Sequence, residues 1–286
     1  MKYLLPVFFF ICALSNAFCQ INVLIDEPND SVRIYETYIS ENLPNASMPI
    51  KYKDGLIFNS KMDTAFYSLY YTDLESEIVK IEISNQNYNV GKATVSSFND
   101  DIFFTMNSCP KHTFNSGEKI CNLAVFEGKI LDFKIQDFDK IGICKNEFNY
   151  WSPSISVDGT NIVIVTNEGG SYQLVEIFKD NRNTWVKGDV LYTSPDKSPI
   201  LNPSSINQDE IYFACSIKGS LSGFDIYKIV KKNGKWQTPE NVKYLNSEFD
   251  DTGVCFVTNN SGYITTNRYT AEDNIYYFQM RGVGRD

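Results

Sequence analysis

The feature of this sequence that most constrains its fold is a pattern that recurs along most of the chain. In each copy, a strand marked by Pro or Ser is followed by a turn of Asp, Asn or Gly, an apolar strand, a polar gap and a further strand. The second strands start at residues 56, 102, 162, 211 and 263, so successive copies are 46, 60, 49 and 52 residues apart. Short strands repeated at this period are typical of a ring of similar β-sheets.

Four short strands per repeat predict the blade of a β-propeller, and the five copies predict an all-β chain with five blades. Six blades is the alternative, and the extra blade would have to lie within residues 29–47 or 126–148. The fifth copy ends after its third strand, so the ring needs a strand from elsewhere. We expect the N-terminal strand Ile21–Ile25 to close it, because this pairing covers an otherwise exposed sheet edge.

The composition argues against several classes of function. The net charge of −9 argues against binding nucleic acid, which requires clustered Lys and Arg. His112 is the single histidine of the 286 residues, which nearly excludes multi-histidine zinc sites and histidine-dependent triads. The 18 Tyr and 20 Phe favour β structure.

The N-terminus has the pattern of a secretory signal peptide. Met1-Lys2 is followed by the apolar run 3–14 and a small or neutral stretch that ends at Gln20. This run is too short for a membrane span, which takes roughly 20 apolar residues. We predict a signal peptide over residues 1–19 and one propeller domain over residues 20–286. The mature chain is then periplasmic and has no transmembrane segment of its own, with association with the outer membrane left open.

The cysteines fit an oxidising compartment. Phe18 stands where a small residue should precede a lipidated cysteine, which disfavours a lipid anchor at Cys19. Cys109 and Cys121 bracket a polar stretch with Pro and Gly, so they are the best candidates for a disulfide. Cys215 and Cys255 lie in apolar strand patterns that predict buried, unreactive thiols.

The acidic residues have a structural interpretation. Asp158-Gly159 is the residue pair that a tight turn between strands favours. The densest acidic group comprises Glu248, Asp250, Asp251 and Asp273, and it lacks the ligand spacing of a known calcium loop. We therefore predict no catalytic residue, no metal ligand and no cofactor.

Several of the copies resemble a known family of propellers. The similarity to the WD-like repeat of TolB-type periplasmic proteins is carried by Ser156–Gly159, Ile211–Phe213, Gly223–Tyr227 and Asn233–Trp236. The last copy is similar to the propeller of OmpA-family envelope proteins linked to gliding motility and type IX secretion, through Asn246–Gly253, Thr266–Arg268 and Asp273–Tyr276. The resemblance covers about Met48 to Phe278. It implies a non-catalytic role in an envelope assembly, with a secretion or motility component of the outer membrane as partner.

Two classes of function remain open. The first is a protein-interaction subunit, for which exposed loop aromatics would serve as anchors. The candidate anchors are Phe66, Tyr67, Phe114, Tyr150, Trp151 and Tyr269. Such a disc could also cap the periplasmic mouth of an outer-membrane channel. The second class is a propeller that binds or degrades glycans with carboxylates in its central channel.

Overall fold

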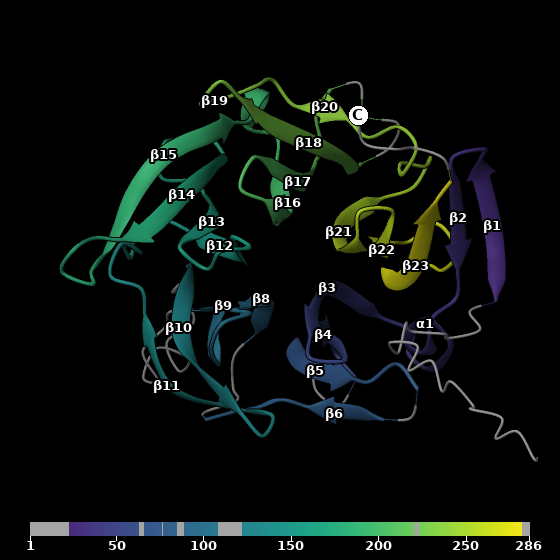
Figure 1. Ribbon diagram of the computed structural model, residues 1–286, viewed down its shortest axis with the longest axis horizontal. Helices are drawn as coiled ribbons and strands as arrows, with labels where there is room; N and C mark the ends of the chain where they lie inside the picture. Colours follow the sequence, from purple (N-terminus) through teal and green to yellow (C-terminus); the bar gives the residue numbers. More distant parts are fainter. Residues whose placement is uncertain are drawn as a thin grey trace, which may run out of the picture.

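The computed structural model describes residues 23–62, 66–75, 77–84, 89–107, 122–218, 220 and 223–281. Within these residues, the strands form five sheets that surround a central axis like the blades of a propeller (Figure 1). The prediction of a five-bladed propeller is confirmed. Residues 29–47 and 126–148 belong to blades of this ring and form no sixth blade.

Blades 1 and 2 follow the repeat read from the sequence. Blade 1 contains β3 (Ala46–Tyr52), β4 (Gly55–Ser60), β5 (Ser68–Thr72) and β6 (Ile78–Lys80). Blade 2 contains β8 (Val90–Val95), β9 (Asp101–Asn107), β10 (Leu123–Leu131) and β11 (Lys134–Lys140). A short strand that precedes them in the chain, β7 (Glu82–Ile83), pairs in parallel with β11 at the outer edge. The first strand of each blade lies nearest the axis, and all other pairs in these two blades are antiparallel.

Blades 3 and 4 repeat this order. Blade 3 contains β12 (Tyr150–Ile155), β13 (Asn161–Thr166), β14 (Gln173–Lys179) and β15 (Trp185–Thr193). Blade 4 contains β16 (Ile200–Asn207), β17 (Glu210–Cys215) and β18 (Asp225–Lys232), with β19 (Lys235–Trp236) and β20 (Glu240–Asn241) both paired to β18. The short 3-10 helix η1 (Pro195–Lys197) connects the two blades. The turn between β18 and β19 is the expected two-residue hairpin, since Asn233 and Gly234 both have positive φ, +52° and +74°.

Blade 5 closes the ring with strands from both ends of the chain. It contains β21 (Asp251–Thr258), β22 (Ser261–Thr266), β23 (Asn274–Met280), β2 (Val32–Tyr35) and β1 (Leu24–Asn29) in spatial order. Closure by the N-terminus is confirmed, but the strand that pairs with β23 is β2 and not the expected segment Ile21–Ile25. The apolar alternation explains this register, because Val32 and Ile34 are fully buried against the blade. The helix α1 (Tyr38–Asn42) then leads into blade 1.

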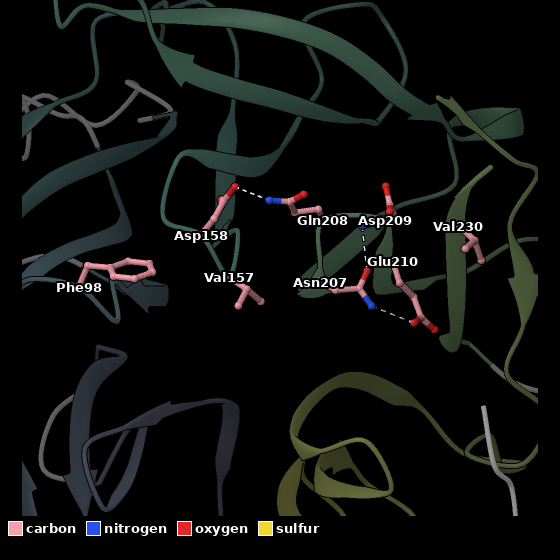
Figure 2. A pocket seen from close by; sticks show the side chains of 8 residues that line it. All are labelled: Phe98, Val157, Asp158, Asn207, Gln208, Asp209, Glu210 and Val230. Carbon is pink, nitrogen blue, oxygen red and sulfur yellow. Dashed lines mark hydrogen bonds between the residues drawn. The ribbon is translucent and has the colours of Figure 1, made fainter. Parts of the chain in front are cut away.

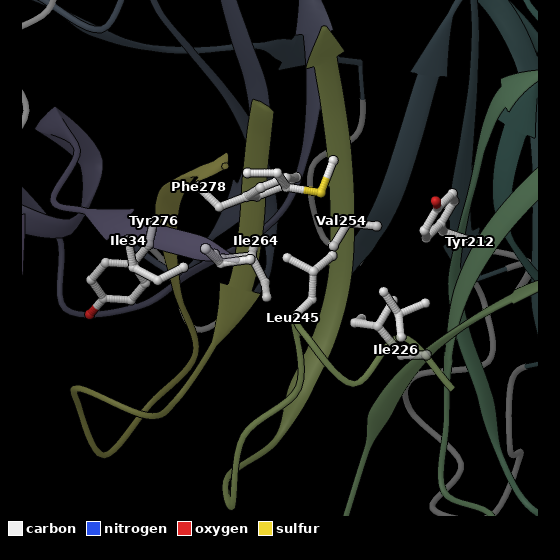
Figure 3. Close-up of a cluster of buried hydrophobic side chains, with 12 residues drawn as sticks. Ile34, Tyr212, Ile226, Leu245, Val254, Ile264, Tyr276 and Phe278 are labelled. Carbon is white, nitrogen blue, oxygen red and sulfur yellow. The ribbon is translucent and has the colours of Figure 1, made fainter. Parts of the chain in front are cut away.

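The hydrophobic core lies between blades. Five clusters of buried apolar side chains each join two neighbouring blades, and together they account for all five junctions of the ring. Figure 3 shows the cluster between blades 4 and 5, where Tyr212 and Ile226 of blade 4 lie near Val254 of blade 5. Closure adds Ile34 of β2 to the same cluster. Each blade is thus stabilised mainly by burying its faces against two neighbours.

The inner strands share an irregularity that sets the geometry of the channel. Met48, Ser152 and Asn202 each have a positive φ of 48° to 58°, and each interrupts the pairing register of its strand. Each of them directly precedes a proline, namely Pro49, Pro153 and Pro203. A bulge at this position turns backbone groups of the inner strand toward the adjacent blade.

Buried polar side chains meet these bulges in what we call the polar ring, composed of Asn59, Thr105, Ser152, Asn202 and Thr265. All five are at most 3% exposed. They make one hydrogen bond across each junction between blades: Asn59 Nδ2 to Val90 O (2.8 Å), Ser152 N to Thr105 Oγ1 (2.9 Å), Ser152 Oγ to Asn202 Oδ1 (3.1 Å), Asn202 Nδ2 to Thr252 O (2.8 Å) and Met48 N to Thr265 Oγ1 (3.2 Å). The ring therefore joins every blade to the next near the axis.

Candidate functional site

One face of the propeller carries the turns that link the first and second strand of each blade, and we call it the hairpin face. These turns lie at residues 53–54, 96–100, 156–160, 208–209 and 259–260. A cavity of about 640 Å³ opens on this face at the mouth of the channel. Side chains of blades 2, 3 and 4 surround it (Figure 2), and they are Phe98, Val157, Asp158, Asn207, Gln208, Asp209, Glu210 and Val230. We call this cavity the mouth pocket.

The apolar side of the mouth pocket is unusually open to solvent. Phe98 is 69% exposed and Val157 is 56% exposed, although both are large hydrophobic residues. The backbone of blade 3 supports the Phe98 ring, since a Cβ added to Gly159 would lie 2.9 Å from Phe98 Cδ2. Gly159 also has a φ of +74°, which a residue with a side chain rarely adopts. The Asp158-Gly159 turn is structural, as the sequence predicts, and it also holds an exposed aromatic ring in place.

Asp158 forms a fixed negative charge at the rim. Its Oδ1 accepts hydrogen bonds from Ser156 Oγ at 2.6 Å and from the backbone nitrogen and the hydroxyl of Thr160 at 3.1 and 2.9 Å. Its Oδ2 accepts a hydrogen bond of 2.6 Å from Gln208 Nε2 of blade 4. These donors, with Ser156 first, lower the pKa of Asp158 to about 2. The side chain is therefore an ionised acceptor and not a proton donor near neutral pH.

Two further carboxylates stand on blade 4. Glu210 accepts a hydrogen bond of 2.8 Å from the Tyr212 hydroxyl and lies 3.5 Å from Asn207 Nδ2. The backbone of Asp209 is held on both sides, by Asn207 Oδ1 at 2.8 Å and by the Lys231 nitrogen at 2.7 Å. Its exposed carboxylate makes no hydrogen bond or ion pair with the side chains that the structure describes. The mouth pocket thus has three acidic side chains and no Lys or Arg in its lining.

Two smaller hollows adjoin the mouth pocket. A groove of about 220 Å³ between blades 3 and 4 shares Asp158, Gln208 and Asp209 with it and also contains Trp236. A hollow of about 510 Å³ between blades 1 and 2 shares Phe98 and contains two bases, Lys51 and Lys53. The groove also contains Glu176 and Lys231, and the hollow also contains Asp100. Acidic side chains therefore outnumber basic ones in the mouth pocket and the groove, whereas the hollow has two bases against one acid.

The inner strands of the channel carry few charged side chains. Among the five inner strands, all of which the structure describes, the one carboxylate is Asp251. The channel instead contains Lys92, which is 4% exposed and donates a hydrogen bond from Nζ to the Pro203 carbonyl of blade 4. Desolvation lowers the pKa of Lys92 to about 7, against a smaller opposing effect of Cys255.

In the acidic group noted in the sequence, Asp251 is fully buried, Asp250 and Asp273 are half-buried and Glu248 is exposed. Asp251 forms an ion pair with Arg268, and the two side chains are 0% and 3% exposed. Asp251 Oδ2 also accepts hydrogen bonds from the backbone nitrogen and the hydroxyl of Ser247 at 2.7 and 3.0 Å. Asp250 accepts from the Phe224 nitrogen at 2.8 Å, and Asp273 accepts from Thr252 Oγ1 at 3.0 Å. Within the described residues, no three His, Cys, Asp or Glu side chains form a cluster suited to a metal ion.

The predicted aromatic anchors do not gather at one site. Tyr150 and Trp151 lie in strand β12, not in a loop as expected, and Tyr150 is 1% exposed. Trp151 packs edge-on against Tyr172 with ring centroids 5.7 Å apart. Tyr269 is part-buried and donates a hydrogen bond of 2.8 Å to Asp26. These three rings contribute to the packing of blades 3 and 5.

The other candidates lie elsewhere. Phe66 is 37% exposed, and the Tyr67 ring has Lys61 Nζ 4.4 Å above it. Whether these residues bind a partner stays a prediction. Three of the sequence predictions fall outside the described residues, namely the signal peptide over residues 1–19, the anchor Phe114 and the disulfide between Cys109 and Cys121.

The buried thiols agree with the sequence. Cys144, Cys215 and Cys255 are all free and buried. Burial raises the pKa of Cys144 to about 11 and that of Cys215 to about 12. The prediction that Cys215 and Cys255 are buried in apolar strands is confirmed, and the raised pKa values favour the protonated, less reactive thiol.

The sequence analysis does not identify the mouth pocket, since it interprets Asp158 as a turn residue and does not consider Phe98 or Val157. The available signal was the position of Phe98, an aromatic residue between Ser96-Ser97 and Asn99-Asp100 in a turn between two strands. A large apolar residue in such a polar turn has no partner within its own hairpin. Val157 gives the same signal in the next blade, directly before Asp158-Gly159.

The architecture and the mouth pocket define the chain as a five-bladed β-propeller. Among solved structures, it is similar to a Bacteroides thetaiotaomicron protein with a suggested glycosidase activity, at 11% identity and a TM-score of 0.52, over 90% of this chain and 94% of that one. It also resembles TolB from Acinetobacter baumannii, at 12% identity and a TM-score of 0.49, over 84% of this chain and 55% of that one. A puromycin-hydrolysing peptidase of Mycobacterium tuberculosis matches at 12% identity and a TM-score of 0.48, over 85% of this chain and 38% of that one.

These similarities extend to the fold alone. This chain spans 55% of TolB and 38% of the peptidase, so each of those proteins has a large part with no counterpart here. No family model matches the sequence, and no curated protein is significantly similar to it. In the described part of the chain, neither helix has the length and apolar character that crossing a membrane would require.

Proposed function

We propose that this propeller is a non-catalytic interaction subunit of a periplasmic assembly at the cell envelope. The observation that carries the proposal is the pair of exposed apolar side chains, Phe98 and Val157, at the rim of the mouth pocket. An aromatic anchor beside a preformed hollow is the usual centre of a protein-protein interface. The rigid hairpins on which both residues stand reduce the entropy that binding must overcome.

The identity of the assembly rests on the sequence. The N-terminal pattern predicts export, and the last repeat resembles propellers linked to type IX secretion and gliding motility. We therefore propose an outer-membrane secretion or motility component as the partner. A flat disc with one binding face would suit a subunit that seals the periplasmic mouth of an outer-membrane channel.

The channel supports a role without catalysis. Glycosidases need two carboxyl groups that face the same bond, with one of them able to donate a proton. Here the single carboxylate of the inner strands is ion-paired with Arg268, and Lys92 occupies the channel. At the rim, Asp158 is held as a carboxylate by its hydrogen bonds. On the described inner strands, no second carboxyl group faces Asp251 across the channel to complete such a pair.

A second candidate function is glycan binding without turnover. The groove between blades 3 and 4 combines Trp236 with the polar side chains of Asn161 and Glu176, a combination suited to the apolar and hydroxyl faces of a sugar. Saturable binding of a soluble glycan that is lost in the Trp236→Ala variant would favour this function.

The decisive experiment is a pull-down of the tagged protein, expressed from its own locus, out of gently solubilised envelopes. We expect the wild type to recover a stoichiometric membrane component and the Phe98→Ala variant to lose it. Phe249→Ala is the matched control, because Phe249 is 52% exposed and lies in the loop before β21, outside the mouth pocket. Recovery of the propeller alone, or an equal loss in both variants, would contradict the proposal.

A further inference from the structure

We propose that the segment of the partner that enters the mouth pocket is a polypeptide with an apolar side chain next to a lysine or arginine. This inference rests on the proposed function and specifies the chemistry of the partner. It follows from two properties of the pocket, its apolar side and its uncompensated negative charge, and from the way charge is distributed on the hairpin face.

The apolar side accounts for the first element of the partner. Phe98, Val157 and Val230 come from three different blades and line one cavity of about 640 Å³. In Figure 2, the Phe98 ring and the Val157 side chain lie around the open centre of the pocket. A leucine-sized or aromatic side chain that covers Phe98 and Val157 removes their exposed surface from water, which is the main driving force of such contacts.

The charge of the pocket accounts for the second element. Asp158, Asp209 and Glu210 all line the cavity, and no basic side chain of the chain lines it with them. Asp158 and Glu210 already accept hydrogen bonds from the protein, while the Asp209 carboxylate is exposed and has no such partner among the described side chains. A carboxylate on a fixed backbone at the edge of an apolar pocket is a suitable acceptor for an ammonium or guanidinium group.

The neighbouring hollow gives the direction of binding. The hollow beyond Phe98 contains Lys51 and Lys53 against one carboxylate, Asp100, so it attracts a basic residue less than the mouth pocket, which has three acidic side chains and no base. A basic side chain of the partner is therefore directed toward blade 4, where Asp209 is available. The apolar residue lies over Phe98, between the two regions.

Two labelled, capped pentapeptides test the inference by fluorescence anisotropy. The first carries a leucine next to one arginine, and the second carries the same leucine next to one glutamate. We expect the arginine peptide to bind and the glutamate peptide not to bind, and we expect binding to weaken as salt rises, since exposed charges are screened. Equal binding of both peptides, or binding that is independent of salt, would overturn the inference.

Variants locate the binding site. We expect affinity for the arginine peptide to fall by about tenfold or more in Phe98→Ala and by roughly threefold to tenfold in Asp209→Asn, where salt dependence also falls. Glu240→Gln is the matched control, because Glu240 is an exposed acid outside the mouth pocket, and it should bind as the wild type does. Unchanged binding in Asp209→Asn, with an unchanged melting temperature, would contradict the assignment.

The two proposals fail in different ways. If the pull-down recovers a partner through Phe98 but the arginine peptide does not bind, only the inference about charge is wrong. If neither the partner nor the peptide depends on Phe98, the hairpin face is not the binding surface and both proposals fail.

Discussion

The mouth of the channel exposes apolar side chains, whereas the interior of the channel buries polar ones. At the mouth, Phe98 and Val157 leave more than half of their surface in water. Inside the channel, Lys92 and the polar ring are almost fully buried. Globular proteins ordinarily bury apolar groups and expose polar ones, so each departure needs a physical reason.

The two regions have different reasons. The polar ring bonds each blade to the next, and every bond also satisfies a backbone or side-chain group at an inner-strand bulge. The exposed side chains of the mouth contribute little to the packing of the blades. We infer that the interior polar groups maintain the closed ring and that the exposed apolar groups serve binding. The predictions below test this division.

The largest expected effect concerns the buried ion pair at the start of β21. Replacing Arg268 with Ala leaves the Asp251 carboxylate buried without its counter-charge, which typically costs about 3–5 kcal/mol of stability. Urea denaturation of Arg268→Ala against the wild type measures this loss. Arg33→Ala is the control, since its ion pair with Glu27 is exposed and its loss should cost less than about 1 kcal/mol. Equal losses in the two variants would show that burial does not increase the contribution of an ion pair to stability.

A smaller loss is expected in the polar ring. Asn202→Ala removes one bond to blade 3 and one to blade 5, and it places a Cβ-bearing residue without a stabilising side chain at φ +48°. We expect a loss of about 2–3 kcal/mol in the free energy of unfolding. Asn202→Gly separates the two causes, because glycine adopts positive φ freely, and it should lose about 1 kcal/mol less. A surface substitution typically costs less than about 0.5 kcal/mol. A loss below this value in both variants would show that the polar ring does not stabilise the closed arrangement of blades.

Lys92 gives a prediction with a dependence on pH. Its pKa is about 7 in the folded protein and 10.5 when unperturbed, so between these values the unfolded state holds more protons. The free energy of unfolding therefore rises with pH through this window, and burial of Lys92 is most unfavourable at and below pH 7.

Lys92→Met lacks this dependence. Relative to the wild type, the variant should be most stable at pH 6, by roughly 1–2 kcal/mol after the loss of the bond to Pro203, and the difference should shrink or reverse by pH 10. Chemical denaturation at pH 6, 8 and 10 measures the difference. A difference that does not change with pH would mean that Lys92 keeps an ordinary pKa.

The smallest effect is expected at the mouth. Phe98→Ala and Val157→Ala should change the free energy of unfolding by less than about 0.5 kcal/mol, because both side chains are largely exposed. Thermal melting of the two variants provides the measurement. A large loss of stability in either variant would mean that the mouth is part of the structural core, and it would weaken the case for binding.

Local patterns are sufficient to predict the repeated strands and the number of blades. The apolar second strands begin within two residues of the predicted positions, as Gly55 and Ser261 illustrate, and the Asn233-Gly234 hairpin forms as its residues require. The closing strand was placed one strand too far out. Both β1 and β2 are short and partly polar, and only the interface between blades selects Val32 and Ile34 for burial.

The candidate site was beyond reach of such patterns. Tyr150, Trp151 and Tyr269 were chosen as loop aromatics, but burial depends on the neighbouring blade, which the local sequence does not specify. Phe98 and Asp209 are 111 residues apart in the chain. They line one pocket because blades 2, 3 and 4 all border the mouth of the channel.

The sequence by itself therefore determined the repeat, the order of the repeated strands and the turns between them, because these depend on periodicity and backbone preferences over a few residues. The tertiary structure alone decided which polar groups are buried, which aromatic rings stay exposed and which acids share a cavity. These properties arise from contacts between blades some fifty residues apart, where closure of the ring, and not local preference, fixes the position of each side chain.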